Sequence, residues 1–380
     1  MRDGWIETSL GEIAEVVGGG TPSTAISEYW DGNIVWLTPT EITSQDGKIV
    51  SDSIRKITDL GFKNSGAQML KKDSVILTSR ASVGYVALSG KDLCTNQGFQ
   101  SLVPKQSVLA KFLMFWIQQN RSEFESRSAG STFKEISKSN VKSIKIELPP
   151  LPEQKRIVDL ISSVDSYIEA LQQQLESAKK SRNAVLHELL TAGGDDWVEH
   201  KLIDMFEIYQ PQTIAKSLMS DDGEFIVFGA NGPIGRYHEF NHDEPEVVVT
   251  CRGATCGTVN MTLPKTWITG NATVVSPKTS EVSKEFLYWA LVAGVDIQSV
   301  ISGSAQPQIT REGLASVKIK IPPLSIQKEI VDLISGFELN ISNSEETLNN
   351  AKSLRSGLLS DLLSGEHEIP ASYDKVIGAA

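Results

Sequence analysis

The side chains that most often perform chemistry, cysteine and histidine, are few in this sequence. Its three cysteines are Cys94, Cys251 and Cys256. Cys251 and Cys256 lie five residues apart in a glycine-rich stretch far from most histidines, so free thiols are expected rather than a disulfide framework or a zinc site. Among the five histidines, His238 and His242 are four residues apart, but Asn-His-Asp-Glu-Pro between and after them is typical of a turn, not of one helix face. The sequence therefore predicts no metal ligands and no cofactor.

Motifs for phosphate binding and group transfer are also missing from the sequence. The run at residues 18–20 is Gly-Gly-Gly, without the Gly-Lys-Ser/Thr ending of a P-loop, and no GxGxxG opens a helix after a strand. No Asn/Asp-Pro-Pro-Tyr/Phe motif of an amino-methyltransferase occurs, and no nucleophile–base set can be found. No catalytic residue is predicted, which argues against an enzyme acting alone.

Composition limits the class of protein further. The chain has 380 residues, of which 40% are hydrophobic and 22% charged, with a net charge of −11. These values exclude a disordered or collagen-like chain and leave room for two or three globular units. No apolar run approaches the roughly 18 residues of a membrane helix, and the first 30 residues lack a signal-peptide pattern, so a cytoplasmic protein is expected. The net charge by itself argues against binding to nucleic acid.

An internal repeat organises the whole chain. Residues 146–191 match residues 319–364 at a constant offset of 173, with about 20 of 46 positions identical. Weaker matches extend upstream, since Gly130-Ser131 corresponds to Gly303-Ser304 and Trp5 to Trp197. The chain is therefore a tandem duplication, and each half is a variable segment followed by a similar helical segment.

Apolar residues of the two similar segments follow alternating steps of four and three. This pattern persists for about five heptads and predicts a coiled coil, because one helix cannot bury such a seam alone. We expect the two copies to pair antiparallel within the chain, which would place Ile157 near Leu362 and Arg182 near Phe337. The alternative is that each helix packs only on its own domain. The seam residues are Ile157, Ile161, Val164, Ile168 and Leu175 in the first helix, and Ile330, Ile334, Phe337, Ile341 and Leu348 in the second.

The variable segments have the patterns of mixed α/β domains. Short β-branched runs predict strands at 34–38, 74–79, 84–88, 99–104 and 141–149, and at 224–229, 246–250, 257–262, 272–277 and 317–322. Buried helices are predicted at 111–120 and 284–292. The fold class is thus mixed α/β (α+β), with two globular domains joined by an antiparallel coiled coil. The expected boundaries are 1–148, 149–193, 194–321, 322–366 and a tail at 367–380.

Both the architecture and several short sequence motifs resemble those of the specificity subunit of a type I restriction–modification system. The motifs that carry the resemblance include GGGTPST at 18–24, ILTSRASVG at 76–84, TNQGFQSLVP at 95–104 and LPPLPEQKRIV at 148–158. In the second half, VVTCRGATCGTV at 248–259 and IPPLSIQKEIVDLI at 321–334 resemble the corresponding parts. The resemblance implies a non-catalytic subunit with two target-recognition domains, at 1–148 and 194–321. Each would read half of a bipartite DNA site, and the helices at 149–193 and 322–366 would set the spacing.

The resemblance also implies which loop residues meet DNA. Bases are read by planar groups, with arginine suited to guanine and asparagine or glutamine to adenine, while hydroxyls and lysine position phosphates. In the first domain the implied contacts are Thr21, Ser23, Trp36, Thr38, Arg80, Asn96, Gln97, Ser131, Thr132 and Lys134. In the second they are Asn231, Arg252, Asn271, Ser304, Gln306 and Gln308. The alternative is that asparagine and glutamine in glycine-rich loops only cap turns.

The distribution of charge bears on the partners that the resemblance implies. Residues 1–148 carry a net charge of +1, whereas residues 194–321 carry −6. A protein that held double-stranded DNA alone would need a denser basic surface. We therefore expect weak DNA binding by the isolated chain, and tight binding together with two methyltransferase subunits and the restriction subunits. The competing interpretation is a non-catalytic scaffold with two ligand- or protein-binding domains on a coiled-coil stalk. A neighbouring reading frame with an Asn-Pro-Pro-Phe motif would favour the specificity subunit.

Overall fold

The computed structural model describes residues 4–130, 134–303 and 305–377. Ser131 and Thr132 of the expected DNA contacts lie outside these ranges, as does Ser304. The chain divides into two compact units, which we describe separately. Unit 1 is Met1–Ala170 with Leu348–Ala380, and unit 2 is Leu171–Thr347. Each unit therefore contains one globular domain, part of the first long helix and part of the second.

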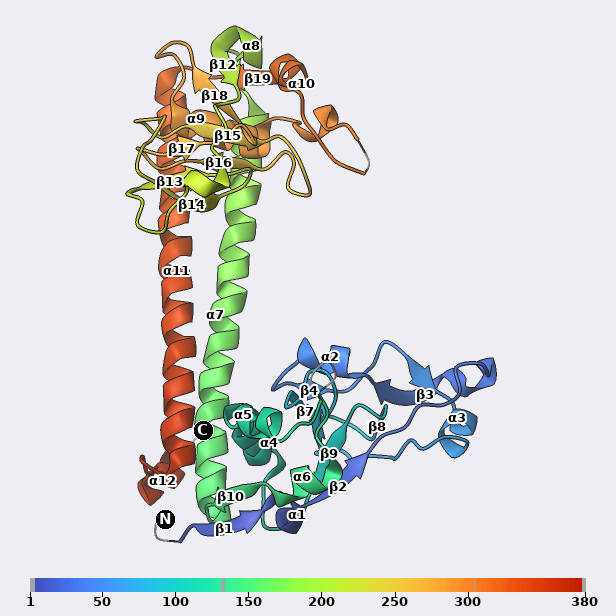
Figure 1. Ribbon diagram of the computed structural model, residues 1–380. Helices are drawn as coiled ribbons and strands as arrows, with labels where there is room; N and C mark the ends of the chain where they lie inside the picture. Colours follow the sequence, from blue (N-terminus) through green and yellow to red (C-terminus); the bar gives the residue numbers. More distant parts are fainter. Residues whose placement is uncertain (1–3, 131–133, 304, 378–380) are drawn as a thin grey trace. The chain divides into compact units, whose positions relative to one another are not determined.

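The domain of unit 1 is built on a five-stranded sheet of order β2-β9-β6-β7-β4 (Figure 1). A three-stranded sheet β5-β3-β8 and a two-stranded sheet β1-β10 complete it. Helix α4 (Ala110–Gln119) contacts β6, β7 and β9 and buries most of its apolar side chains, as its sequence predicts. The strands are β1 (Ile6–Ser9), β2 (Ala14–Gly18), β3 (Trp30–Leu37), β4 (Ile49–Val50), β5 (Lys56–Ile57), β6 (Val75–Leu77), β7 (Val86–Ser89), β8 (Cys94–Thr95), β9 (Gln100–Pro104) and β10 (Lys145–Leu148). The short helices are α1 (Leu10–Ile13), α2 (Pro39–Thr43), α3 (Asp59–Lys63), α5 (Arg121–Ser126) and α6 (Lys138–Ser143).

The domain of unit 2 repeats this plan in a smaller form. Its main sheet has the order β12-β18-β15-β16, beside a three-stranded sheet β14-β13-β17 and a two-stranded sheet β11-β19. Helix α9 (Lys284–Trp289) packs on β15 and β16. The strands are β11 (Val198–Lys201), β12 (Phe206–Tyr209), β13 (Phe225–Phe228), β14 (Pro233–Tyr237), β15 (Val247–Thr250), β16 (Val259–Met261), β17 (Trp267–Ile268), β18 (Ala272–Pro277) and β19 (Lys318–Ile321). Short helices α8 (Leu202–Met205) and α10 (Arg311–Ser316) flank them.

Two of the sequence-based boundaries are wrong. The predicted strand at 141–149 begins as helix α6, because Ser137 caps the helix by accepting a hydrogen bond from the main-chain N–H of Asn140; only its end forms β10. The predicted helix at 284–292 ends earlier as an α-helix, and a π-helical turn follows at Ala290–Gly294. The other predicted strands and the helix at 111–120 are confirmed within a few residues.

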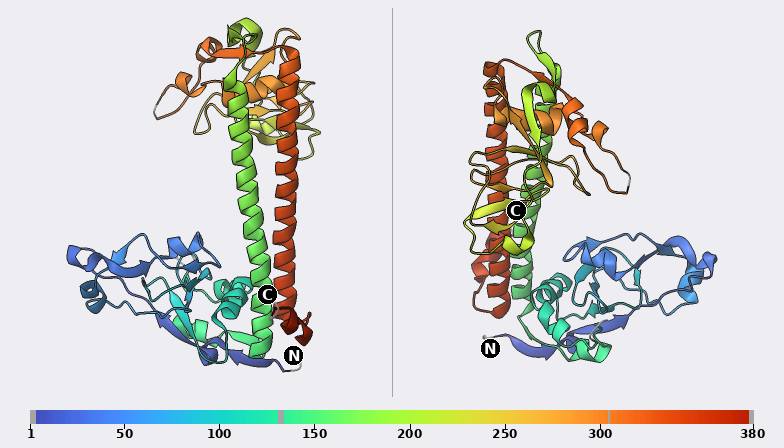
Figure 2. Two further views of the ribbon diagram at one scale, coloured as in Figure 1. Left: turned by 180° about the vertical axis from the view of Figure 1, so that it is seen from behind. Right: turned by 45° about the horizontal axis from the view of Figure 1, so that its top comes forward.

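The two long helices are α7 (Leu151–Ala192) and α11 (Leu324–Ser364), which lie side by side in both figures that show the whole chain (Figures 1 and 2). Each begins directly after a Pro-Pro pair, and each ends before a glycine with positive φ, +62° at Gly193 and +74° at Gly365. In unit 1, Ile157 and Ile161 of α7 share a buried cluster with Leu359 and Leu362 of α11. The start of one helix thus packs on the end of the other, so the pair is antiparallel.

Unit 2 contains the same pairing in reverse roles. Leu186 and Leu190 near the end of α7 share a buried cluster with Ile330 and Ile334 near the start of α11. Among the ten expected seam residues, eight are buried, while Val164 and Phe337 are half-buried. This burial is what an interhelical seam requires, since each side chain must be covered by the facing helix.

Polar seam positions are occupied by two arginines that correspond in the repeat. In unit 1, Arg355 of α11 pairs with Asp165 of α7, and its guanidinium carbon lies 5.5 Å from the ring of Phe115. In unit 2, Arg182 of α7 pairs with Glu338 of α11 and lies 5.7 Å from the ring of Trp289. The aromatic ring that Arg182 contacts is thus Trp289, while its ion-pair partner Glu338 directly follows Phe337, the residue that the seam matching places near Arg182.

A buried glutamine ties each long helix to its own domain. Gln154 in the first turn of α7 is fully buried; it accepts a hydrogen bond from the main-chain N–H of Leu109 (2.8 Å) and donates to two carbonyls. Gln327 in α11, its repeat equivalent, accepts from the N–H of Ser283 (3.0 Å) and also donates to two carbonyls. Because a buried amide without these partners would be costly, each glutamine fixes how the helix leaves its domain.

Candidate nucleic-acid interface

The polar loops of unit 1 come together although they are distant in sequence. The N–H of Gly20, in the glycine-rich loop after β2, donates to the carbonyl of Thr95 at 2.9 Å. The N–H of Ser79, after β6, donates to the carbonyl of Gly98 at 2.7 Å. Three loops that the sequence singled out, at 18–24, 79–84 and 95–100, are therefore joined by main-chain hydrogen bonds.

Several candidate side chains in these loops bond to neighbouring loop atoms. Thr21 donates from its hydroxyl to the side-chain oxygen of Gln97, and Asn96 accepts from the N–H of Gly98 at 2.8 Å. Thr38 caps helix α2 together with Glu41. Thr21 and Gln97 are exposed, while Asn96 and Thr38 are half-buried. The turn-capping alternative thus describes Asn96 as it stands in this structure, whereas Thr38 caps a helix.

Arg80 lies where the loop after β6 meets the segment at 128–137. Its Nε pairs with a carboxylate oxygen of Glu135 at 2.9 Å, and the two side chains are 45% and 46% exposed. Alongside, the N–H of Ala81 donates to the carbonyl of Lys134 at 3.0 Å, and Ala81 has a positive φ of 58°. Lys134, whose side chain is exposed, therefore adjoins this loop through its main chain.

Unit 2 assembles the corresponding loops. The hydroxyl of Thr250 at the end of β15 donates to the carbonyl of Ala230, in the loop at 229–235. The N–H of Cys251 donates to the carbonyl of Asn271, and its own carbonyl accepts from the N–H of Ile309 at 3.0 Å. The loops at 229–235, 251–257, 270–271 and 302–308 are thus brought to one place.

The candidate side chains of unit 2 that the structure describes are exposed. Asn231 accepts a hydrogen bond from the side chain of Asn260 at 2.8 Å. Arg252 stands opposite Gln308 in an isolated antiparallel bridge. The exposed candidates of this unit are Asn231, Arg252, Asn271, Gln306 and Gln308.

Arg80 and Arg252 hold equivalent places with different neighbours. Arg80 forms a β-bridge with Glu135, and Arg252 forms one with Gln308, which is the repeat equivalent of Glu135. Within residues 4–130, 134–303 and 305–377 no carboxylate pairs with the Arg252 side chain, whereas Arg80 is neutralised by Glu135. A guanidinium without a local acid keeps all its donors for an external acceptor, so Arg252 is the more available of the two.

Two of the expected contact residues, Trp36 and Ser23, contact the side chain of Trp30. Trp36 is only 4% exposed, packs edge-on against Trp30 and donates from its indole N–H to the carbonyl of Gly20 at 2.9 Å. Its ring is therefore buried and not at the surface, and it holds the glycine-rich loop through this hydrogen bond. Ser23 is exposed, and its carbonyl accepts from the Trp30 indole.

Sequence reasoning missed the acidic residues that organise these loops. Glu41 is buried and accepts hydrogen bonds from the N–H and hydroxyl of Thr38 and from the N–H of Ile54. A readable signal was present, since Thr-Pro-Thr-Glu at 38–41 has the spacing of a capping box. Glu135 could have been found through the repeat, which places it opposite Gln308.

The cysteines are unpaired, and burial shifts the pKa of one thiol and one imidazole. All three cysteines are free, and burial raises the pKa of the Cys94 thiol to about 12. Burial also lowers the pKa of His242, whose ring lies 3.0 Å from the hydroxyl of Tyr209. Among the described residues no three His, Cys, Asp or Glu side chains are grouped as a metal site. None of the described helices has an apolar stretch sufficient to cross a membrane.

Comparison with known proteins places this geometry in a family. A family model described as the type I restriction modification DNA specificity domain matches residues 2–180 and again residues 194–352. The MjaIX specificity subunit of Methanocaldococcus jannaschii is 37% identical over 178 residues, which are 46% of this chain and 41% of that protein. The EcoprrI specificity subunit of Escherichia coli is 26% identical over 366 residues, covering 90% of each chain.

Solved structures share the fold. The crystal structure of a type I restriction–modification S subunit from M. genitalium has a TM-score of 0.58 at 18% identity, over 94% of this chain and 96% of that one. A chain from a structure on complex assembly and conformational transition of a type I system gives 0.65 at 20% identity, over 96% and 98%. The family model covers most of the chain as two copies, one on each sequence repeat. This chain therefore belongs to the family of type I restriction–modification specificity subunits.

Proposed function

We propose that this chain is the non-catalytic DNA-recognition subunit of a type I restriction–modification complex, and that each domain reads one half of a bipartite site. The observation that carries the proposal is the matched pair of loop clusters. Each cluster presents an arginine at the end of an equivalent strand, Arg80 after β6 and Arg252 after β15, among amide and hydroxyl side chains. Such planar donors and acceptors suit the edges of base pairs. The proposed recognition domains are residues 1–148 and 194–321, joined by spacers at 149–193 and 322–366, with a tail at 367–380.

The two arginines would act differently on DNA. Arg252 would donate directly to guanine or to a phosphate, because its side chain has no acidic neighbour in the described ranges. Arg80 would reach a base only together with Glu135, whose carboxylate can accept from the amino group of cytosine. The other proposed contacts are Thr21, Ser23, Thr38, Asn96, Gln97, Ser131, Thr132 and Lys134 in the first domain, and Asn231, Asn271, Ser304, Gln306 and Gln308 in the second.

Partner subunits would supply the catalytic activities and most of the contacts that hold the DNA backbone. With a net charge of −6 on residues 194–321, this half gains little from counterion release on its own. The proposed partners are double-stranded DNA, two methyltransferase subunits and the restriction subunits. We expect the isolated chain to bind DNA weakly and the complex with methyltransferase subunits to bind far more tightly. Equal affinity with and without the methyltransferase in a gel-shift titration would contradict this division of roles.

The decisive experiment compares three variants in the assembled methyltransferase. Arg252→Ala removes the charge and the planar guanidinium, and Arg252→Lys retains the charge alone. Lys320→Ala removes an exposed positive charge of unit 2 on strand β19, outside the four loops of the candidate interface. If Arg252 reads a base, both Arg252 variants should lose roughly 5- to 150-fold in affinity for the target. Non-target affinity should fall with Arg252→Ala but persist with Arg252→Lys.

The outcomes distinguish a contact with a base from electrostatic attraction to the DNA phosphates. Lys320→Ala should leave both affinities within about twofold, since one exposed charge outside the loop cluster contributes little. If Arg252→Lys bound the target as tightly as the unaltered chain, Arg252 would be a phosphate contact. If neither Arg252 variant changed target binding, the loop cluster of unit 2 would not be the interface.

The spacer role is tested by shortening both long helices together. Residues 168–174 of α7 face residues 345–351 of α11 when the seams are matched antiparallel. Deleting both heptads would shorten the pair by about 10 Å, equivalent to roughly three base pairs. Mapping of methylated sites should then reveal the same half-sites with a shorter gap. Deleting 168–174 alone serves as the control, because it would mismatch the seams and abolish modification. An unchanged gap in the doubly deleted chain would refute the spacer role.

A further inference from the structure

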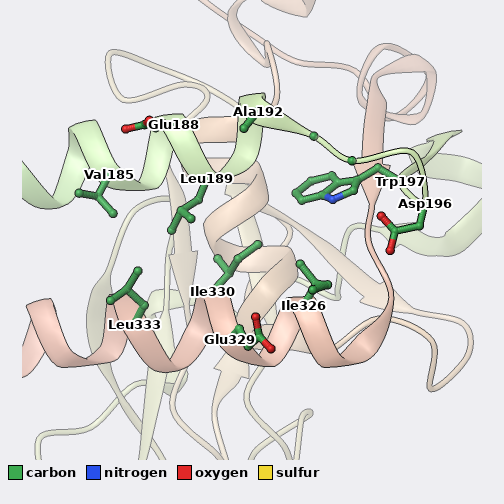
Figure 3. A pocket seen from close by; sticks show the side chains of 12 residues that line it. Val185, Glu188, Leu189, Ala192, Asp196, Trp197, Ile326, Glu329, Ile330 and Leu333 are labelled. Carbon is green, nitrogen blue, oxygen red and sulfur yellow. The ribbon is translucent and has the colours of Figure 1, made fainter.

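An open apolar groove lies in unit 2, where the end of α7 runs beside the start of α11 (Figure 3). Its volume is about 580 Å³. Apolar side chains from both helices line it, together with the indole of Trp197 in the following segment. The apolar lining residues are Val185, Leu189, Ala192, Trp197, Ile326, Ile330 and Leu333.

The equivalent place in unit 1 is covered by the chain's own C-terminal tail. There, the start of α7 runs beside the end of α11, and Ile369 of the tail is buried in the same cluster as Ile157 and Leu362. Tyr373 packs on this cluster, and Asp374 pairs with Arg156 of α7 at 3.1 Å. A short segment with two large apolar side chains four residues apart therefore covers this junction.

Without such a cover, the groove of unit 2 leaves apolar surface exposed. Leu160 of unit 1 packs against the buried cluster, whereas its repeat equivalent Leu333 is 47% exposed. Trp5 of unit 1 is 4% exposed, whereas its equivalent Trp197 is half-buried. Apolar surface rimmed by charged residues in this way can bind apolar side chains of another protein.

The rim of the open groove carries negative charge. Glu188, Asp196 and Glu329 are exposed among its lining residues, and none of the described lining residues is lysine or arginine. Glu329 is the repeat equivalent of Arg156, so the charge that holds Asp374 in unit 1 is reversed in unit 2. The chain's own acidic tail is therefore a poor match for this groove, and so is the tail of a second copy.

We infer that the groove of unit 2 is a docking site for a short basic and apolar segment of another protein. The segment would carry two bulky apolar side chains about four residues apart, as Ile369 and Tyr373 are in the tail. It would also carry a lysine or arginine where the tail has Asp374, facing Glu329. This inference does not depend on DNA reading by the domains, and its test contains no DNA.

A peptide derived from the tail provides the probe. The probe peptide has the sequence of residues 365–377 with Asp374→Arg, and the unaltered tail peptide is its matched control. With the full-length chain, we expect the probe peptide to bind roughly fivefold more tightly than the control, as expected for one favourable ion pair replacing a repulsion. Fluorescence anisotropy of labelled peptides measures both affinities.

Two chain variants decide whether the groove itself binds. Glu329→Arg should reverse the order of the two peptides, and Leu333→Glu should abolish binding of both. Both positions are exposed, so neither change should prevent folding. Hydrogen exchange on peptide binding should slow at 185–197 and 326–333. The inference is overturned if the probe peptide does not bind at about 1 mM, if Glu329→Arg does not reverse the preference, or if protection appears elsewhere but not in these segments.

Discussion

Removing one partner of the seam ion pair in unit 1 should destabilise the pairing of the long helices. Arg355 of α11 donates to both carboxylate oxygens of Asp165 in α7, with one contact at 3.2 Å, and lies over the ring of Phe115. Asp165→Asn would leave a guanidinium in the seam without its counter-charge. Arg355→Met would leave the carboxylate in the same position. The two changes together remove both charges and keep a side chain of similar length.

The magnitude follows from the burial of the pair. Its side chains are 22% and 36% exposed, which lies between a surface ion pair worth about 0–1 kcal/mol and a buried one whose breaking costs about 3–5 kcal/mol. We therefore expect each single substitution to cost about 2 kcal/mol of unfolding free energy. The double variant should cost less than the sum of the two, because removing both charges leaves no uncompensated charge in the half-buried seam. For a unit of about 200 residues, 2 kcal/mol corresponds to a fall in Tm of about 4–8 °C.

Thermal and urea unfolding of the four chains, followed by far-ultraviolet circular dichroism, would measure this double-mutant cycle. Lys328→Met provides the control, since its ion pair with Asp332 is 78% and 65% exposed and should contribute little. The reasoning is wrong if the single variants unfold at the same midpoint as the unaltered chain. It is also wrong if the double variant loses the full sum, because the two side chains would then act independently.

Three further predictions concern buried polar and titratable groups. Gln154→Met should lower the unfolding free energy by about 2–4 kcal/mol, because one buried N–H and two carbonyls lose their hydrogen-bond partner. Gln327→Met should have the same effect in unit 2, and urea unfolding measures both. Cys94 should react with a thiol reagent at pH 8 more slowly than the half-buried Cys256, because burial holds the pKa of Cys94 near 12. Mass spectrometry of partly labelled protein would give the order of labelling, and early labelling of Cys94 would contradict the prediction. Burial lowers the pKa of His242, so the unfolded chain binds the proton more readily, and stability should fall as the pH drops through about 6.5; His242→Gln should reduce this dependence in unfolding scans between pH 5 and pH 8.

The amino-acid sequence by itself determined the elements that depend on local periodicity. A constant repeat, two Pro-Pro pairs and two glycines defined α7 and α11 to within about two residues, because helix termini are set by residues in the adjacent turn. Alternating four- and three-residue steps also predicted which face of each helix is buried. Most strands could be recognised for the same reason, since β-branched runs bounded by glycine are a local signal.

Only the tertiary structure decided which distant side chains meet. Arg80 and Arg252 look alike in sequence, yet one faces Glu135 and the other Gln308, because loops about 55 residues apart along the chain lie side by side. Trp36 was expected at the surface, but the fold buries it under the glycine-rich loop. Repeat equivalence likewise could not indicate that the tail covers the helix junction of unit 1 while that of unit 2 is open. Local pattern fixes which residues form a helix or strand, whereas contacts between loops and tails depend on packing over the whole chain.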